Sequence, residues 1–117
     1  MASRKNGKNA GKSAKRSIGF LEKQLAKKFK HAEDFGIKGN YNKQNAAKLK
    51  SAIEKHVFDN ETTPISGTYR GINVTHYVNP KTGLNVIVDS AGQFHSGWKL
   101  SSAQLKHVLS TGKLGGG

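Results

Sequence analysis

The spacing of apolar residues changes near residue 67, and this change restricts the folds open to the chain. Before it, apolar residues recur every three or four positions, as they do on one face of a helix. The spacing predicts a first helix over 18–35, which Gly36 ends, and a second helix over 42–58. The segment 59–66 contains Asn60 and Pro64, and we expect it to be a loop.

After residue 67, short runs of β-branched and aromatic residues alternate with turn residues. Short turns between successive strands favour an antiparallel meander. A last helix should begin at Ser101, which forms a capping box with Gln104, and should end at Gly112. The sequence therefore predicts an α+β fold in which an antiparallel four-stranded β-meander packs with two N-terminal helices and one C-terminal helix. The strands are expected over 68–70, 72–78, 84–88 and 93–99.

We expect one folded domain, because 117 residues can form a single modest core. This domain should cover 19–114. Residues 1–18 are rich in Lys and Arg and contain no acidic residue, which is typical of a flexible basic arm or linker. The glycines of 115–117 are expected to form a disordered tail.

The charge of the chain favours a polyanionic partner. The formal net charge is +13 and the sequence pI is about 10.2, which favours nucleic acid over an anionic membrane surface. The absence of cysteine excludes a thiolate nucleophile and sulfur-ligated zinc. No run of 18 apolar residues is present, and no cofactor-binding loop or metal-binding spacing of histidines is visible. We therefore expect no stable membrane association, no small-molecule cofactor and no metal site.

The stretch Lys27-Lys28-Phe29-Lys30-His31 surrounds one imidazole with three ammonium groups. The unperturbed pKa of histidine is about 6.5, so His31 can act as a general base or a general acid near neutral pH. The neighbouring lysines should lower its pKa by like-charge repulsion. Lys28 lies at the border of the apolar face of the predicted helix. It either extends its charge to solvent or occupies a cleft where the charge is needed.

The last predicted strand carries a second group of candidates. Strict alternation would place Phe94, Ser96 and Trp98 on one face, and His95 with Lys99 on the other. Trp98 is either a core residue or a platform for a nucleobase, and Ser96 is positioned to donate a hydrogen bond to a phosphate oxygen. We interpret His95 as an ordinary strand residue that points away from Ser96.

These parts suit a metal-independent ribonuclease. A base removes the proton from a ribose 2′-hydroxyl, an acid protonates the departing 5′-oxygen, and cations stabilise the charge on the phosphoryl oxygens. The products would be a 2′,3′-cyclic phosphate and a 5′-hydroxyl, so DNA could not be a substrate. Lys28 and Lys30 would supply the positive charge. Lys30 can join His31 only if the helix bends or ends around residues 30–35, or if the ligand wraps around the helix.

Two motifs also carry a family resemblance. Residues 27–36 (KKFKHAEDFG) resemble the catalytic helix of the colicin D-like tRNase domains. Residues 67–70 (GTYR), 79–80 (NP) and 94–99 (FHSGWK) resemble the strand region of the same family, in the same order. The resemblance covers about 19–114, and the sequence departs from the family pattern at Glu33 and His95.

The resemblance implies a toxin domain from the C-terminus of a bacteriocin or of a contact-dependent growth inhibition effector. Such a domain would be secreted or delivered from the cell surface as part of a larger protein. It would cleave tRNA in the cytoplasm of the target bacterium, possibly in the anticodon loop of arginine tRNAs, and would be neutralised by an acidic cognate immunity protein. Its catalytic residues fall on His31, Lys28, Lys30, Ser96 and Trp98. We also expect Lys27, Arg70 and Lys99 to bind RNA.

The main alternative is a non-catalytic basic RNA-binding module. This alternative explains the positive charge and the tryptophan of the chain equally well. Binding alone, however, does not require a group that titrates near neutral pH. RNA that is bound but left uncut would favour this alternative. A membrane-active domain is disfavoured by the strand-rich second half.

Overall fold

The computed structural model describes residues 18–115 of the chain, which form helices and one β-sheet. The predicted arm over 1–18 and tail over 115–117 lie outside this part, apart from Ile18 and Gly115. The elements are α2 (Glu22–Lys28), a 3-10 helix η2 (Phe29–Phe35), α3 (Lys43–Phe58), β1 (Thr63–Tyr69), β2 (Ile72–Val78), β3 (Leu84–Asp89), β4 (Phe94–Lys99), α4 (Ser102–Thr111) and β5 (Lys113–Leu114).

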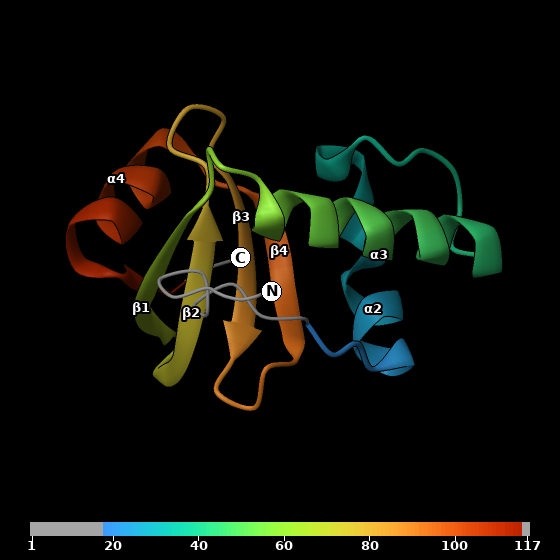
Figure 1. The fold of residues 1–117 in the computed structure, drawn as a ribbon, viewed down its shortest axis with the longest axis horizontal. Helices are drawn as coiled ribbons and strands as arrows, with labels where there is room; N and C mark the ends of the chain where they lie inside the picture. The colour runs from blue at the N-terminus through green and yellow to red at the C-terminus, as the bar shows by residue number, and fades with distance from the viewer. Residues whose placement is uncertain (1–17, 116–117) are drawn as a thin grey trace, which may run out of the picture.

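The sheet has the order β4-β3-β2-β1-β5 (Figure 1). Strands β1 to β4 are joined in antiparallel pairs, so the α+β fold and the predicted meander are confirmed. The fifth strand was not predicted. It has only two residues, too few for a recognisable pattern, and it pairs in parallel with the end of β1.

Two of the predicted element boundaries are wrong. Strand β1 begins at Thr63 rather than Thr68, so half of the expected loop over 59–66 belongs to the sheet. Pro64 pairs with Tyr77 of β2, and β5 reaches only Thr68 and Tyr69 on the other side. The first part of β1 is thus a sheet edge, where the missing N–H of proline costs no ladder hydrogen bond.

The first helix begins later than predicted, at Glu22, but ends at Phe35 before Gly36 as predicted. Gly19 forms a parallel bridge beside β4, in which its N–H donates to Gly92 O at 2.9 Å and its carbonyl accepts from Phe94 N at 2.8 Å. This bridge holds the backbone extended until Leu21. The α-helix then runs only to Lys28 and continues as the 3-10 helix η2, which ends at Gly36 in the left-handed conformation.

The other helices follow the predicted signals. The side chain of Asn42 accepts a hydrogen bond from Asn45 N and begins α3, and the Ser101–Gln104 capping box begins α4. No helix within 18–115 is long and apolar enough to cross a membrane.

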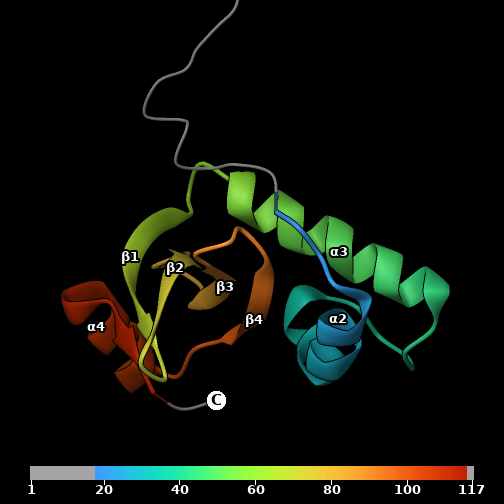
Figure 2. The same ribbon diagram turned by 90° about the horizontal axis from the view of Figure 1, so that it is seen from below.

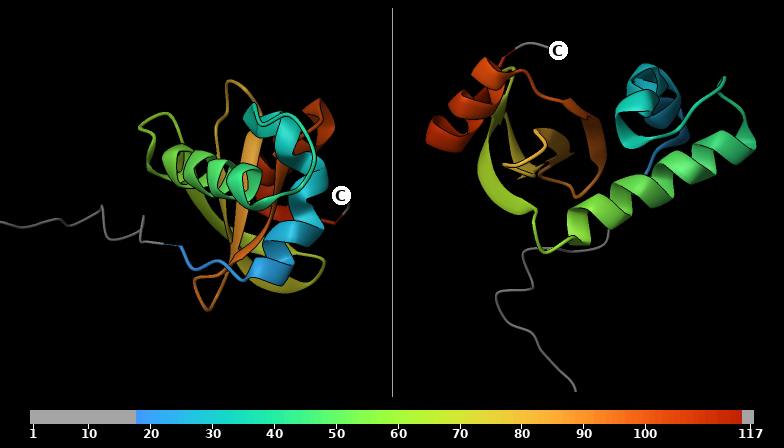
Figure 3. Two further views of the ribbon diagram at one scale, coloured as in Figure 1. Left: turned by 90° about the vertical axis from the view of Figure 1, so that its right-hand side faces the viewer. Right: turned by 90° about the horizontal axis from the view of Figure 1, so that it is seen from above.

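The sheet separates two hydrophobic cores. One core joins α2, η2 and α3 to one face of the sheet through residues such as Leu25, Ile53 and Val86. The second core lies on the other face, where Val108 of α4 meets Ile87 and other strand residues. Figure 3 shows α4 apart from the α2–α3 layer, with the sheet between them.

The sheet is strongly curved. In a flat sheet β1 and β4 would be about 14 Å apart, because β2 and β3 lie between them. Instead, the ring of Tyr69 at the end of β1 lies 5.4 Å from the His95 ring and 5.9 Å from the Trp98 ring of β4. Figure 2 shows β1 and β4 curling toward the same side. This curvature brings the end of β1, the first strand of the meander, next to β4, its last strand.

Candidate active site

The free edge of β4 is covered by α2 and η2, and these contacts position the candidate site. The Gln24 side chain of α2 donates from Nε2 to the His95 carbonyl at 2.5 Å. The Asp34 carboxylate of η2 accepts from Lys99 N at 2.9 Å. An edge strand held at both ends in this way fixes the segment 28–31 against β4.

His31 lies in η2 with its ring against Trp98. The two ring centroids are 5.5 Å apart and the rings are tilted by 34°. His31 is half-buried, and its Nε2 is buried with no hydrogen-bond partner within 18–115. Burial lowers the pKa of His31, the charges of Lys30 and Lys28 lower it further, and Asp34 opposes this shift. The imidazole is therefore held toward its neutral form, as the lysine-rich sequence predicted.

Lys28, the last residue of α2, is half-buried. Burial lowers its pKa first, followed by the charges of Lys30, Lys27 and Arg70. Lys28 is thus partly buried with other cations near it, and its place in a cleft that needs the charge stays a prediction. Such a group of like charges is stabilised by a bound anion.

Lys27 and Lys30, which flank Lys28 in the sequence, are both exposed. The sequence allowed Lys30 to join His31 if the helix changed course, and the helix does change from α to 3-10 at Phe29. The charge of Lys30 then lies near enough to lower the pKa of both Lys28 and His31.

Arg70 occupies the two-residue turn between β1 and β2. Its φ of 50° is unusual for a residue other than glycine, and Gly71 follows with a φ of 84°. The guanidinium lies 5.4 Å from the Tyr69 ring centroid. Burial and the charges of Lys30 and Lys27 lower the pKa of Lys28 in α2, and the charge of Arg70 adds to this shift. Arg70 therefore belongs with Lys27, Lys28 and Lys30 to one group of cations, the cation group. Lys99 is exposed at the other end of β4, beside Asp34.

The two β4 candidates are buried on the α4 side of the sheet. Trp98 is only 7% exposed, belongs to the second core, and has Nε1 3.4 Å from Gln104 Oε1. This favours a role in supporting His31 over a role as an exposed platform for a base. Ser96 pairs with Ile87 and is fully buried, and its Oγ has no hydrogen-bond partner among the described residues.

A β-bulge in β4 makes the strict alternation wrong. Val88 pairs with Phe94 and Ile87 pairs with Ser96, so His95 is the extra residue. Phe94 consequently belongs to the first core, whereas Trp98 belongs to the second. The predicted shared face of Phe94, Ser96 and Trp98 is therefore incorrect.

The bulge also changes the interpretation of His95. Its half-buried ring contacts Tyr69, which in turn contacts Trp98. Burial lowers the pKa of His95, Lys28 lowers it further, Asp89 opposes the shift, and Lys27 and Arg70 add to it. Sequence reasoning missed both His95 and Tyr69. The GTYR motif pointed to this strand end, but no local signal in the sequence indicated the bulge.

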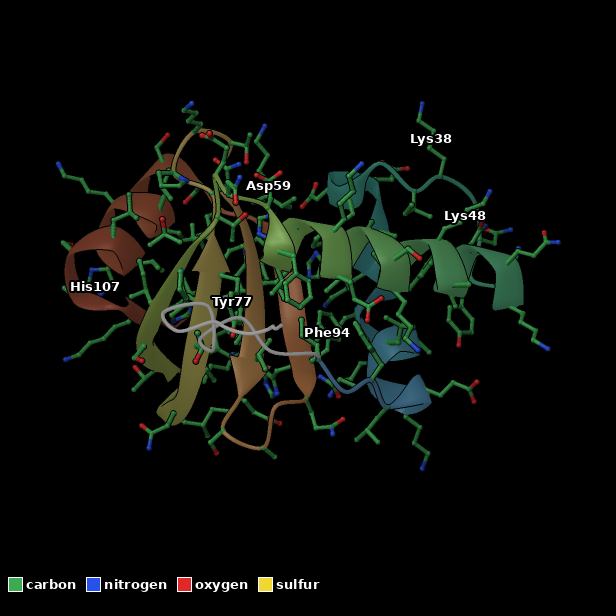
Figure 4. The ribbon with its side chains drawn as sticks, in the orientation of Figure 1. Lys38, Lys48, Asp59, Tyr77, Phe94 and His107 are labelled. Atoms are coloured by element: carbon green, nitrogen blue, oxygen red, sulfur yellow. The ribbon has the colours of Figure 1, made fainter. Side chains whose placement is uncertain are left out.

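The remaining histidines lie elsewhere. His76 is buried within the sheet, where Nε2 is 3.0 Å from the carbonyl oxygens of Thr68 and Gly112 and Nδ1 is 3.2 Å from Asn85 Nδ2. His107 is exposed on the outer side of α4 (Figure 4). Within 18–115, no three His, Asp or Glu side chains are grouped so that they could hold a metal ion.

Comparison with known proteins gives a consistent result. A family model described as Colicin D matches residues 24–108. Colicin-D from Escherichia coli is 46% identical over 86 residues, which are 70% of this chain and 12% of that protein. A solved structure described as a ribonuclease from Escherichia coli complexed with its inhibitor protein has a TM-score of 0.68 and 42% identity. That match covers 78% of this chain and 100% of the ribonuclease chain.

Proposed function

The chain belongs to the colicin D family, and from this we propose that it is a toxin domain that cleaves tRNA without a metal ion. The observation that carries the proposal is the position of His31, which lies between Lys28, Lys30 and the Trp98 ring. The name of the solved relative supports ribonuclease activity. The chain spans only 12% of the length of Colicin-D, so the activity proposed here is that of the toxin domain.

The reaction follows from the groups in the site. His31, held toward its neutral form, removes the proton from a ribose 2′-hydroxyl. The 2′-oxygen attacks the phosphorus, and the bond to the 5′-oxygen breaks. The ends formed are a 2′,3′-cyclic phosphate and a 5′-hydroxyl.

Lys28 and Lys30 stabilise the negative charge on the phosphoryl oxygens. Their mutual repulsion, which lowers the pKa of Lys28, is relieved when an anion binds between them. Lys27, Arg70 and Lys99 extend the positive surface around this point and bind the RNA backbone.

Trp98 and Ser96 support the site from β4. Trp98 holds the His31 ring in place through direct contact. Ser96 is fully buried and its hydroxyl has no hydrogen-bond partner among residues 18–115, so its contact with a phosphate oxygen stays a prediction that requires β4 to open locally.

The same positively charged surface also indicates which partners the domain would bind. We propose that an acidic immunity protein covers the cation group and competes with tRNA for it, as charge complementarity favours. We further propose that the larger protein is secreted or carried on the cell surface and that this domain acts in the cytoplasm of the target bacterium. Arginine tRNAs are the first substrates to test.

The test is incubation of the protein with total tRNA in the presence of EDTA, followed by sequencing of the fragment ends. We expect discrete fragments with 2′,3′-cyclic phosphate and 5′-hydroxyl ends. His31→Ala should reduce cleavage at least about 10²-fold, the lower end of the usual contribution of a general base. The matched control His107→Ala, on the outer side of α4, should cleave normally.

Three results would reject the proposal. Cleavage that stops in EDTA, or fragments that end in a 3′-hydroxyl, would exclude the metal-independent route. RNA that binds but is never cut would favour the non-catalytic RNA-binding module.

A further inference from the structure

The bulge in β4 places a second imidazole in the site proposed above. We propose that His95 is the general acid that protonates the departing 5′-oxygen while His31 acts as the base. This inference rests on the proposed ribonuclease function and adds a catalytic residue to it. It depends on three features of the site: the bulge, the ring contacts and the shared neighbour Lys28.

The bulge directs the side chain. Without an extra residue, alternation would point His95 away from the side of β4 that carries Trp98. With it, the His95 ring meets the Tyr69 ring edge-on, at 5.4 Å and 71°. The Gln24 side chain holds the His95 carbonyl at 2.5 Å and so fixes the backbone of the bulge to α2. Bulges that redirect a side chain in this way are common next to active sites.

A continuous series of rings links the two imidazoles. His31 contacts Trp98 at 5.5 Å, Trp98 contacts Tyr69 at 5.9 Å, and Tyr69 contacts His95 at 5.4 Å. Trp98 and Tyr69 belong to the second core, so the series rests on buried support. His31 and His95 are only half-buried, so part of each ring stays exposed to a ligand, although Nε2 of His31 is buried.

Lys28 lies near both imidazoles. Its charge acts on His31 and on His95, although these residues come from different elements. A phosphate bound at Lys28 would thus lie near both imidazoles. Two groups are needed there, because the attacking and leaving oxygens lie roughly in line across phosphorus and a base and an acid must act on opposite sides of it.

The proton transfers balance. His31 takes the proton of the 2′-hydroxyl as the bond from O2′ to phosphorus forms. Protonated His95 gives a proton to O5′ as the bond from phosphorus to O5′ breaks. One imidazole gains the proton that the other loses, and solvent restores both without any other reactant.

The surroundings of His95 control its protonation. Burial disfavours the imidazolium most, Lys28 and Lys27 of α2 and Arg70 of the β1–β2 turn add to this, and Asp89 of β3 opposes it. A bound phosphate adds negative charge beside Lys28 and thereby favours the protonated form. The neutral form of His95 is thus favoured in the free protein, and a bound phosphate shifts the imidazole back toward protonation.

The experiment compares two tRNA substrates at the cut site mapped with the wild-type protein. In one, the leaving 5′-oxygen is natural; in the other, sulfur replaces it, and a thiolate leaves without needing a proton. On the natural tRNA, His95→Gln should lower kcat by about 10²–10⁴-fold and remove the alkaline limb of the pH–rate profile. On the sulfur substrate, the variant should cleave within about tenfold of wild type.

Two further variants serve as comparisons. His31→Gln should be slow on both substrates, because the base is needed for each, and His107→Gln should match wild type on both. The deciding quantity is the ratio of sulfur to oxygen rates within one preparation, which does not depend on how much of that preparation is folded.

Three outcomes contradict the inference. A His95→Gln rate near wild type on natural tRNA shows that His95 is not needed. An equal loss on both substrates shows a structural role. If wild type cuts no tRNA, the proposed function itself fails, and this result is distinct from a failure of His95 alone.

Discussion

His31 is placed among charges that oppose its own protonation. Lys30 and Lys28 both lower its pKa, after burial, and Asp34 alone opposes them. A general base must be neutral to accept a proton, so these lysines extend the pH range in which His31 can work. In the proposed reaction they also bind the phosphate, so one set of charges would serve both binding and catalysis.

Lys30 is the better lysine with which to test this effect, because it is exposed and its removal should leave folding intact. With Lys30→Ala, the pKa of the His31 imidazole in the free enzyme rises. The acid limb of the kcat/KM profile should then move to higher pH, while the maximal rate falls about 10-fold to 100-fold. Measurement of kcat/KM for tRNA between pH 4.5 and 8, with buffers near ~0.1 M ionic strength, would show the shift.

The matched control is Lys48→Ala, an exposed lysine on α3 (Figure 4). Its acid limb should coincide with that of wild type. A limb that stays in place or moves to lower pH in Lys30→Ala would mean that His31 is not the base.

Among the elements, η2 decides the geometry of the site. It carries His31, and the Asp34 carboxylate ties its second half to Lys99 N at 2.9 Å. The 3-10 geometry rotates successive side chains by about 120° instead of about 100°, so the lysine side chains around His31 are not arranged as in an α-helix. The tie to β4 and the 3-10 turn together hold His31 against Trp98.

Removal of this tie should therefore damage catalysis more than stability. Asp34→Ala should lower the free energy of unfolding by about 1 kcal/mol, because one hydrogen bond to a carboxylate is lost. It should lower kcat about 10-fold to 100-fold, since a small displacement of a catalytic group is costly. The measurements are urea unfolding and single-turnover cleavage of tRNA.

Glu33→Ala removes the neighbouring exposed acid and keeps the contact to Lys99. This variant should leave both the free energy of unfolding and kcat nearly unchanged. Equal kcat values for the two variants would show that the link between η2 and β4 does not position His31.

Sequence patterns predicted the elements better than the contacts that build the site. The period of the apolar residues, the capping box at Ser101 and the short turns were sufficient for the α+β meander. The start of α2 and the bulge at His95 depend instead on long-range contacts, such as those of Gly19 with Phe94 and of Gln24 with His95. No local pattern encodes such contacts, so the lysine group around His31 could be predicted but the position of His95 could not.

On the scale of the whole molecule, the curvature of the sheet brings together basic side chains from distant parts of the sequence. Lys27 and Lys28 come from α2, and Arg70 comes from the turn after β1. The formal net charge of +13 adds a long-range attraction for polyanions. Binding of tRNA should thus release many counterions and depend steeply on salt.

The salt dependence can separate residues that bind RNA from residues that only add charge. In a His31→Ala background, which keeps tRNA uncut, log Kd should rise linearly with log[KCl]. Arg70→Ala, Lys27→Ala and Lys99→Ala should each reduce the slope by about 0.7–0.9, the value for one phosphate contact, whereas Lys48→Ala should leave it unchanged. Fluorescence anisotropy with labelled tRNA across a series of KCl concentrations measures the slopes. Equal slopes for all four variants would mean that tRNA is held by overall charge and has no fixed path across Arg70 and the α2–β4 edge, because a defined path loses a specific contact with each residue removed.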